Sequence, residues 1–322
     1  MPLTNVSPER NGAVMNGQTY RTWLIGALAS GLVTVFAGCR PAAKPEKAEI
    51  ASAESVAKGR PITGRVVSVL KERGSLLVDH DEIPGYMPRM TMEFAVGAGD
   101  LALAKEGAEL RATLVEEGEG KFRLEGVWWQ DAVAEVAVRK AADQLREDTN
   151  IRGRGAYREV GENLPDFALY TQNGEVAQAA RWRGKQIMMN FIYSRCPIAT
   201  MCPLATSKMM ETQKLAKEAG VPNLEFVSIT LDPEYDTPGV LREYAEARGI
   251  DTSNFSFLTG PEGAIKDLLK QFGVLTELEG EKGSPLIKHT LATLLINEQG
   301  KIAWRADGSG WSPAEFVGKM KR

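Results

Sequence analysis

Two cysteines and one histidine in the second half of the chain have side chains that could do metal or redox chemistry. Cys196 and Cys202 lie in the segment 191–203 with five residues between them, and His289 follows far downstream. Two thiolates and an imidazole form a soft-to-borderline ligand set that suits copper. The same sulfurs could instead close a disulfide, either redox-active or purely structural in an oxidising compartment. Metal and redox chemistry therefore compete for one site.

A second group of soft ligands lies nearer the N-terminus. His80 is followed by a turn-rich stretch and then by Met87, Met90 and Met92. In a strand, Met90 and Met92 point to the same face, and a turn after His80 would fold the imidazole over them. Thioethers with an imidazole favour Cu(I) or Ag(I) over hard ions. The alternative is that the methionines fill gaps in a core, which is their usual role.

The third cysteine, Cys39, stands at the end of an export signal. Arg21 precedes an apolar run over 22–38, as in secretory signals. The run resembles a bacterial lipoprotein signal, which implies removal of residues 1–38 and acylation of Cys39. The alternative is an uncleaved anchor, because a membrane span needs about 20 apolar residues and this run is nearly that long. In both cases we expect a protein tethered to the membrane at its periplasmic face.

The charge balance excludes nucleic acid as a partner. The chain has 39 Lys and Arg against 42 Asp and Glu, and removing Arg10, Arg21 and Glu9 with the signal changes the net charge from -3 to -4. Such a balance provides no electrostatic footprint for DNA or RNA.

Composition divides the rest of the chain into four parts. Residues 39–60, rich in Ala, Lys, Glu and Pro, predict a spacer. Residues 61–131 predict a small all-β, OB-like barrel with strands at 62–70, 75–80, 90–96, 109–116 and 121–129, separated by turn residues. A helical linker is expected over 132–160, with its helix at 131–148 and a glycine-containing loop from 150. The fourth part covers 161–322.

Strands and helices alternate in this fourth part, which predicts an α/β sheet wrapped by helices. Strands are expected at 186–193, 224–231, 290–297 and 301–306, and helices at 203–219, 238–248, 264–272 and 313–321. A reactive cysteine between a buried strand and a helix is the thioredoxin layout. Pro203 fits the first turn of that helix, which would place Cys202 near its positive end and favour the thiolate.

The stretch with His80, Met90 and Met92 resembles the periplasmic copper-binding CusF-like domains, over roughly residues 61–131. In those domains a histidine is followed by a Met-x-Met pair, so the resemblance implies Cu(I) binding by these three side chains. Those domains also place a tryptophan against the copper. Here Met87 occupies the comparable place, which offers a third thioether instead of a cation–π lid.

The second half resembles the SCO/SenC family over about residues 160–322. The matching segments are 190–197, which ends in Cys196 and Pro197, then Cys202-Pro203, 231–238 and Lys288-His289-Thr290. The resemblance implies a thioredoxin-like fold, copper binding by Cys196, Cys202 and His289, and the supply or reduction of the dinuclear copper centre of cytochrome oxidase. This chain differs in having five residues between the cysteines instead of three, and Lys288 where an acidic residue is common.

Four residues of this half could also have roles other than metal binding. Asp232 and Asp236 could contact a metal or a partner, but their sequence context favours turns and a helix N-cap. Met201 adjoins Cys202, and we expect it in core packing rather than as a ligand. His289 alone would by default be a satisfied core histidine, and its match to the family motif favours the ligand role.

Together these features predict a membrane-tethered, extracytoplasmic copper chaperone that delivers copper to cytochrome c oxidase or another cuproprotein without catalytic turnover. The ion is Cu(I), with Cu(II) left open. The alternative is a thiol–disulfide oxidoreductase that reduces the cysteines of a copper site, with Cys196 attacking and Cys202 resolving. A thiol peroxidase would share the fold, but its expected single-cysteine context is missing.

Overall fold

The computed structural model describes residues 59–118, 120–279 and 286–320. The expected signal at 1–38, Cys39 and the spacer up to residue 58 lie outside this range. None of the helices within it is long and apolar enough to cross a membrane.

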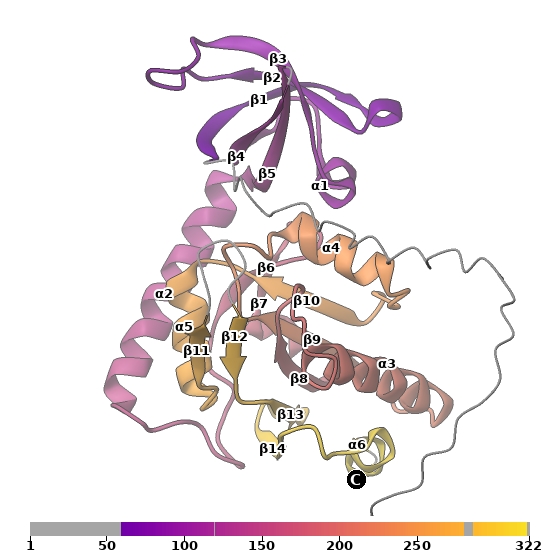
Figure 1. Cartoon of the computed structure of the whole chain (residues 1–322). Helices are drawn as coiled ribbons and strands as arrows, with labels where there is room; N and C mark the ends of the chain where they lie inside the picture. The colour runs from indigo at the N-terminus through magenta and orange to yellow at the C-terminus, as the bar shows by residue number, and fades with distance from the viewer. Residues whose placement is uncertain (1–58, 119, 280–285, 321–322) are drawn as a thin grey trace, which may run out of the picture. The chain divides into compact units, whose positions relative to one another are not determined.

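Residues 60–130 form a closed five-stranded barrel, seen in indigo and purple in Figure 1. Its strands are β1 (Arg60–Leu70), β2 (Ser75–His80), β3 (Met90–Ala95), β4 (Glu109–Gly118) and β5 (Lys121–Gln130), in the order β1-β2-β3-β5-β4. Alternating apolar side chains fill its core, among them Val66, Val78, Phe94 and Leu110. The predicted barrel is confirmed, and every strand end lies within two residues of its expected place.

Two short helices in the barrel were not predicted. They are η1 (Lys71–Arg73) and α1 (Ala98–Leu103), and α1 lies where a polar turn was expected. A helix of six residues spans fewer than two turns, so its sequence is too short to show a helical period.

The second domain is built on a seven-stranded sheet in the order β14-β13-β8-β9-β10-β6-β7. Its parallel centre consists of β8 (Gln186–Ile192), β9 (Leu224–Thr230) and β10 (Phe255–Thr259). Antiparallel strands flank it, with β13 (Ala292–Ile296) and β14 (Ile302–Asp307) on one side and β6 (Ala168–Thr171) and β7 (Val176–Gln178) on the other. The centre is buried along nearly its whole length, as expected for a sheet covered on both faces.

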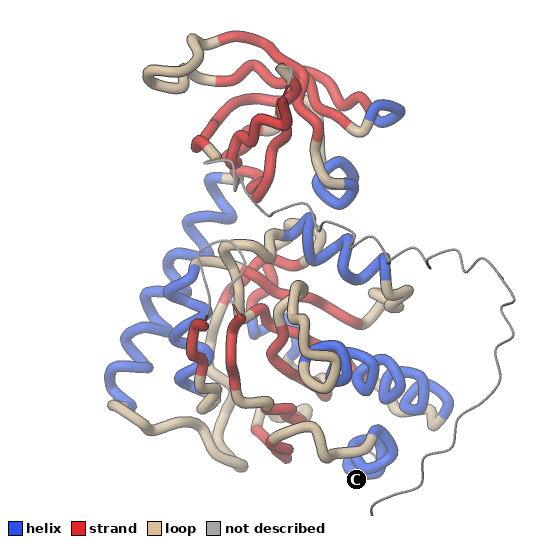
Figure 2. Tube along the Cα trace, in the orientation of Figure 1, coloured by secondary structure: helices blue, strands red, loops and turns tan. Residues whose placement is uncertain are grey.

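Helices cover both faces of this sheet (Figures 1 and 2). Helices α3 (Cys202–Glu218) and α4 (Pro238–Ala247) connect parallel neighbours, so right-handed crossovers place them on one face, where α6 (Pro313–Met320) packs against α3. Helix α5 (Glu262–Gln271) packs against α2 (Ala132–Arg152) on the other. The predicted α/β thioredoxin-like fold is confirmed.

Several short elements of this domain were missed. They are β6, β7, β10, η2 (Ala179–Trp182), and the hairpin strands β11 (Thr276–Glu279) and β12 (Leu286–His289). All have five residues or fewer, a length at which strand and loop patterns are hard to tell apart.

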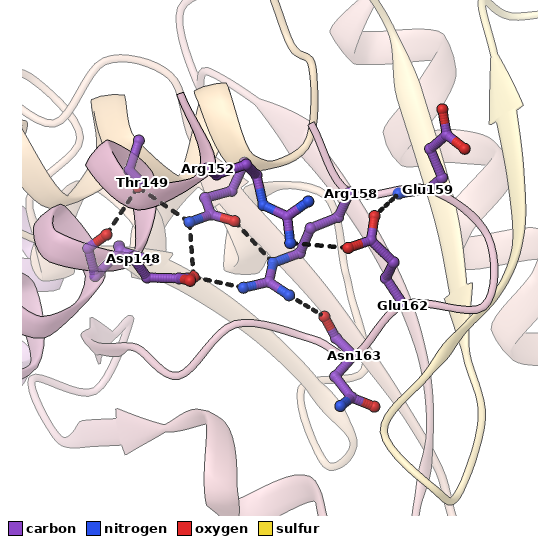
Figure 3. A network of polar contacts seen from close by, with 9 residues as sticks. Asp148, Thr149, Arg152, Arg158, Glu159, Glu162 and Asn163 are labelled. Atoms are coloured by element: carbon purple, nitrogen blue, oxygen red, sulfur yellow. Dashed lines mark hydrogen bonds and ion pairs between the residues drawn. The ribbon is translucent and has the colours of Figure 1, made fainter. Parts of the chain in front are cut away.

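Helix α2 runs past its expected end at residue 148 to Arg152, and it packs on the second domain. Leu145 belongs to that domain's core. The buried Arg158 guanidinium donates to Asp148, to the Asn163 carbonyl and to Gln271 of α5, as Figure 3 shows in part. This polar network fixes the last turn of α2 against α5, so the helix is not an isolated connection.

Candidate metal centres

Cys196 and Cys202 lie on the turn that joins the central strand β8 to helix α3. Cys202 is the first residue of α3, with Pro203 in its first turn as expected. Cys202 is fully buried and Cys196 is 8% exposed. Both are free thiols, so the site holds two sulfurs that are not consumed by a disulfide.

His289 ends β12, and its imidazole faces Cys202. The His289 Nε2 atom lies 3.2 Å from Cys202 Sγ, and Nδ1 lies 3.1 Å from the Thr290 carbonyl oxygen. Because a carbonyl only accepts, Nδ1 carries the proton and the lone pair of Nε2 is directed at the thiol. The Cys202 S–H therefore donates to Nε2. A soft ion can enter such a pair by replacing the thiol proton.

Cys196 lies beside Cys202 but does not complete a closed set. The two thiols interact directly, and each such contact disfavours the Cys202 thiolate. Within the described ranges, no group of three or more His, Cys, Asp and Glu side chains is arranged to hold a metal ion. The structure therefore brings Cys202 and His289 into contact and leaves Cys196 next to the pair.

Burial dominates the electrostatics of this site. It raises the pKa of the Cys202 thiol well above its ordinary value, although the backbone N–H groups of Tyr193 and Cys202 oppose the shift. The expected thiolate at the helix N-terminus is therefore wrong, because desolvation outweighs the two N–H groups that favour it. Burial also lowers the pKa of His289, against the opposing hydrogen bond to Thr290. The metal-free pair is thus neutral on both sides near pH 7.

Tyr193 was not predicted as a site residue, yet it contacts all three candidate ligands. Its backbone N–H donates towards Cys202 Sγ, and its carbonyl accepts from the Cys196 N–H at 3.3 Å. Its ring meets the His289 ring edge-to-face, with centroids 6.0 Å apart at 76°. Its place three positions before Cys196, at the end of an apolar strand, was the signal that could have identified it.

Two carboxylates hold the cysteine turn in place. The fully buried Asp236 accepts from the Ser194 N–H at 3.1 Å, from the Ser194 hydroxyl, and from the Thr230 hydroxyl at 2.5 Å. Asp232 pairs with Arg195 at 2.7 Å. The N-cap of α4 is Thr237, so the N-cap prediction for the aspartates is wrong, and they anchor the turn instead.

Met201 precedes α3 and packs, partly buried, against the core of the domain. This placement agrees with the expected packing role.

In the barrel, β2 and β3 present His80, Met90 and Met92 on one side. The register pairs His80 with Met90 and Val78 with Met92, and directly opposite side chains of antiparallel strands share a face. Met90 is 43% exposed, whereas Met92 is partly buried against the core. Met87 pairs with Ile83 across the intervening turn and also packs against the barrel core.

The buried His80 imidazole has a free nitrogen. Its Nδ1 lies 2.7 Å from the Asp81 carbonyl and therefore carries the proton, while Nε2 has no hydrogen-bond partner in the structure. A buried polar atom left unpaired costs about 1–3 kcal/mol, so it indicates a ligand position. In both centres the histidine donates Nδ1–H to the carbonyl of the next residue, as metal-ligating histidines do. This leaves the Nε2 lone pair of His80 without a partner and directs that of His289 at the Cys202 thiol.

Comparisons with known proteins match the two parts of the chain separately. The SCO1/SenC family model matches residues 156–322, more than half of the chain. The chain therefore belongs to the SCO1/SenC family. A second model, described as "Copper binding periplasmic protein CusF", matches residues 60–128.

Individual relatives match part of the chain. The SCO2-like protein RC0895 of Rickettsia conorii is 33% identical over 139 residues, which are 42% of this chain and 65% of that protein. The SCO1 protein homolog of Bacillus subtilis is 27% identical over 153 residues, 47% of this chain and 77% of that protein. The crystal structure of a SCO1/SenC family lipoprotein from Bacillus anthracis is 26% identical with a TM-score of 0.46, covering 52% of this chain and 98% of that one. The chain spans about 65% of the length of the rickettsial relative.

Proposed function

We propose that this chain is an extracytoplasmic copper chaperone with two soft sites. One site consists of His80, Met87, Met90 and Met92, and the other of Cys196, Cys202 and His289. Copper is the cargo, and cytochrome c oxidase or another cuproprotein is the acceptor. The CusF match supports copper as the cargo. Membership of the SCO1/SenC family supports the acceptor class that the sequence resemblance implies.

The observation that carries this proposal is the 3.2 Å contact between Cys202 Sγ and His289 Nε2. Cys202 is buried, His289 is partly buried, and the pair is neutral and preformed, so a cuprous ion that displaces the thiol proton adds its charge where the proton was. Soft sulfur donors select copper over magnesium, calcium and manganese. The methionine thioethers of the barrel also favour copper over zinc, because thioethers are poor ligands for zinc.

The difference in exposure between the two sites indicates a direction of transfer. Met90 is 43% exposed and reachable from solvent, whereas Cys202 is fully buried. We infer that the barrel captures Cu(I) and that the second domain receives it and delivers it. Two sites on one chain that are joined by a short connection have an effective concentration relative to each other of about millimolar, which favours transfer between them. Acylation of Cys39, with residues 39–60 as the spacer, would hold both sites at the membrane.

The second candidate function is thiol–disulfide exchange on the cysteines of a copper site. The two adjacent free thiols favour it. Cys196 would attack, because it is the more exposed of the two and the pKa of the Cys202 thiol is raised by burial. A redox titration with turnover on a cysteine-pair substrate tests this function, and a pair inert to exchange would rule it out.

The direct test is titration of the full chain with Cu(I) against a competing chelator. We expect two sub-micromolar sites, one lost in Cys196→Ala and the other in Met90→Ala. Val67→Ala is the matched control for the barrel, because Val67 is also exposed, at 48%, and apolar but lies on β1. Unchanged binding in the Cys196→Ala variant would refute the proposal for the second domain.

A further inference from the structure

The side-chain hydroxyl of Tyr193 is buried at the second site, the one formed by Cys196, Cys202 and His289, without a hydrogen bond of normal geometry. Tyr193 is only 1% exposed, and its hydroxyl has no partner with normal geometry in the structure. Buried tyrosines usually find a partner, and leaving the hydroxyl unpaired costs about 1–3 kcal/mol. A buried hydroxyl that makes only a loose contact with the Cys196 thiol indicates a hydrogen bond that tightens when the site is occupied.

The neighbours of this hydroxyl limit what that partner can be. The Cys196 thiol lies beside it, and the Ile287 backbone N–H approaches it from β12. A tyrosine hydroxyl, whose ordinary pKa is about 10, keeps its proton at neutral pH and acts as a donor. A neutral thiol is a weak acceptor, whereas a metal-bound thiolate is a strong one.

We propose that Tyr193 is a positioning residue of the copper site, whose hydroxyl donates a hydrogen bond to the Cys196 sulfur once copper has replaced the thiol protons. This inference rests on the proposed function of that site. The displaced protons leave to solvent, and no electron is transferred in the binding step.

The surrounding structure prevents Tyr193 from turning away. Its carbonyl holds the Cys196 N–H, and the next residue, Ser194, is held twice by the buried Asp236. The ring edge against His289 fixes the other side. The donor is therefore preorganised before copper arrives, and its ring keeps the imidazole directed at Cys202.

A hydrogen bond to a copper thiolate has a consequence for the oxidation state of the metal. The sulfur carries more negative charge on Cu(I) than on Cu(II), because Cu(II) withdraws more of its electron density. A donor at that sulfur therefore favours Cu(I), in line with the tuning of copper sites by hydrogen bonds around the cysteine sulfur.

The test is Tyr193→Phe in the full chain, in a Met90→Ala background that removes the barrel site. Phenylalanine keeps the ring contact with His289 and removes only the hydroxyl. We expect the ratio of Cu(I) to Cu(II) affinity to fall about tenfold, which is about 59 mV in a one-electron potential. The sulfur-to-Cu(II) charge-transfer band should move to lower energy.

The matched control is Ser228→Ala, which removes another buried hydroxyl of the same domain, bonded to Asn190 at 2.6 Å. It should lower thermal stability but leave the potential and the band unchanged. An unchanged potential and band in Tyr193→Phe would overturn the inference while leaving the copper site intact. If copper binding in the parent is insensitive to Cys196→Ala, the proposed function fails and this inference fails with it.

Discussion

Replacing Asp236 with asparagine should change how the stability of the second domain depends on pH. Asp236 is fully buried, and burial raises its pKa from 3.8 to about 6. Hydrogen bonds from Ser194 and Thr230 oppose this shift without cancelling it. The folded state therefore binds the carboxyl proton more tightly than the unfolded state does.

The sign of the effect follows from that difference in proton affinity. Below pH 4 the carboxyl is protonated in both states, and above pH 6 it is ionised in both. Between these values the folded state loses stability as pH rises, because ionisation is penalised only in the interior. A shift of about 2 units corresponds to about 3 kcal/mol. The asparagine amide cannot titrate, so the Asp236→Asn variant should gain about 3 kcal/mol relative to the parent between pH 4 and pH 7.

The assay is urea denaturation of the reduced, copper-free full chain, followed by the helical circular dichroism signal. That signal reports mainly on the second domain and α2, because the long helices lie there. Asp251→Asn is the control, because the pKa of this exposed carboxyl is shifted in the opposite direction: hydrogen bonds from Ser253 lower it. Its stabilising contribution is present above pH 4 and is lost on acidification. Parallel pH profiles for the parent and the Asp236→Asn variant would refute the reasoning.

The other predictions concern the two sites and the polar network. Cu(I) affinity at the second site should rise at least tenfold per pH unit from pH 7 to 8. Copper displaces the proton of Cys202, whose pKa is raised, whereas His289, whose pKa is lowered, is already neutral. Competition with a chelator at several pH values measures this, and an affinity independent of pH contradicts it. Gly64→Ala should weaken copper binding in the barrel, because the added Cβ would lie 2.8 Å from His80 Cα and displace this ligand. The same titration measures the affinity, and an affinity equal to that of the parent contradicts the prediction. Arg158→Met should lower the free energy of unfolding of the second domain by about 3 kcal/mol, because it leaves buried acceptors unpaired. Urea denaturation measures this, and a loss below about 1 kcal/mol would contradict the role given to the network.

Local pattern was sufficient to predict most of the fold. Strand ends of the barrel and the helices α3, α4 and α6 follow from alternation, turn residues and Pro203, Pro238 and Pro313 at helix starts. Short elements such as α1 and β10 were missed because they depend on tertiary contacts more than on their own residues. The end of α2 was also misplaced, because the Arg158 network that holds its last turn draws on Gln271, far away in the sequence.

The candidate ligands could be named from residue type and spacing, but their state could not. Residue type and the resemblance to the SCO/SenC family identified Cys196, Cys202 and His289 as one ligand set, but they did not reveal that Cys202 is a neutral thiol donating to Nε2. The sequence context also assigned Asp236 to capping, because a sequence shows which residues can accept hydrogen bonds and not which donors the fold brings to them.

The amino-acid sequence by itself determined the kind of donor atoms, the order of the two domains and the softness of the ions they suit, since these depend on residue identity and local periodicity. Only the tertiary structure decided which histidine nitrogen carries the proton, that the Cys202 thiol keeps its proton and that Tyr193 touches every ligand of the second site. Those properties arise from burial and from contacts between distant segments, which alter the free energy of each protonation state without leaving a local trace in the chain.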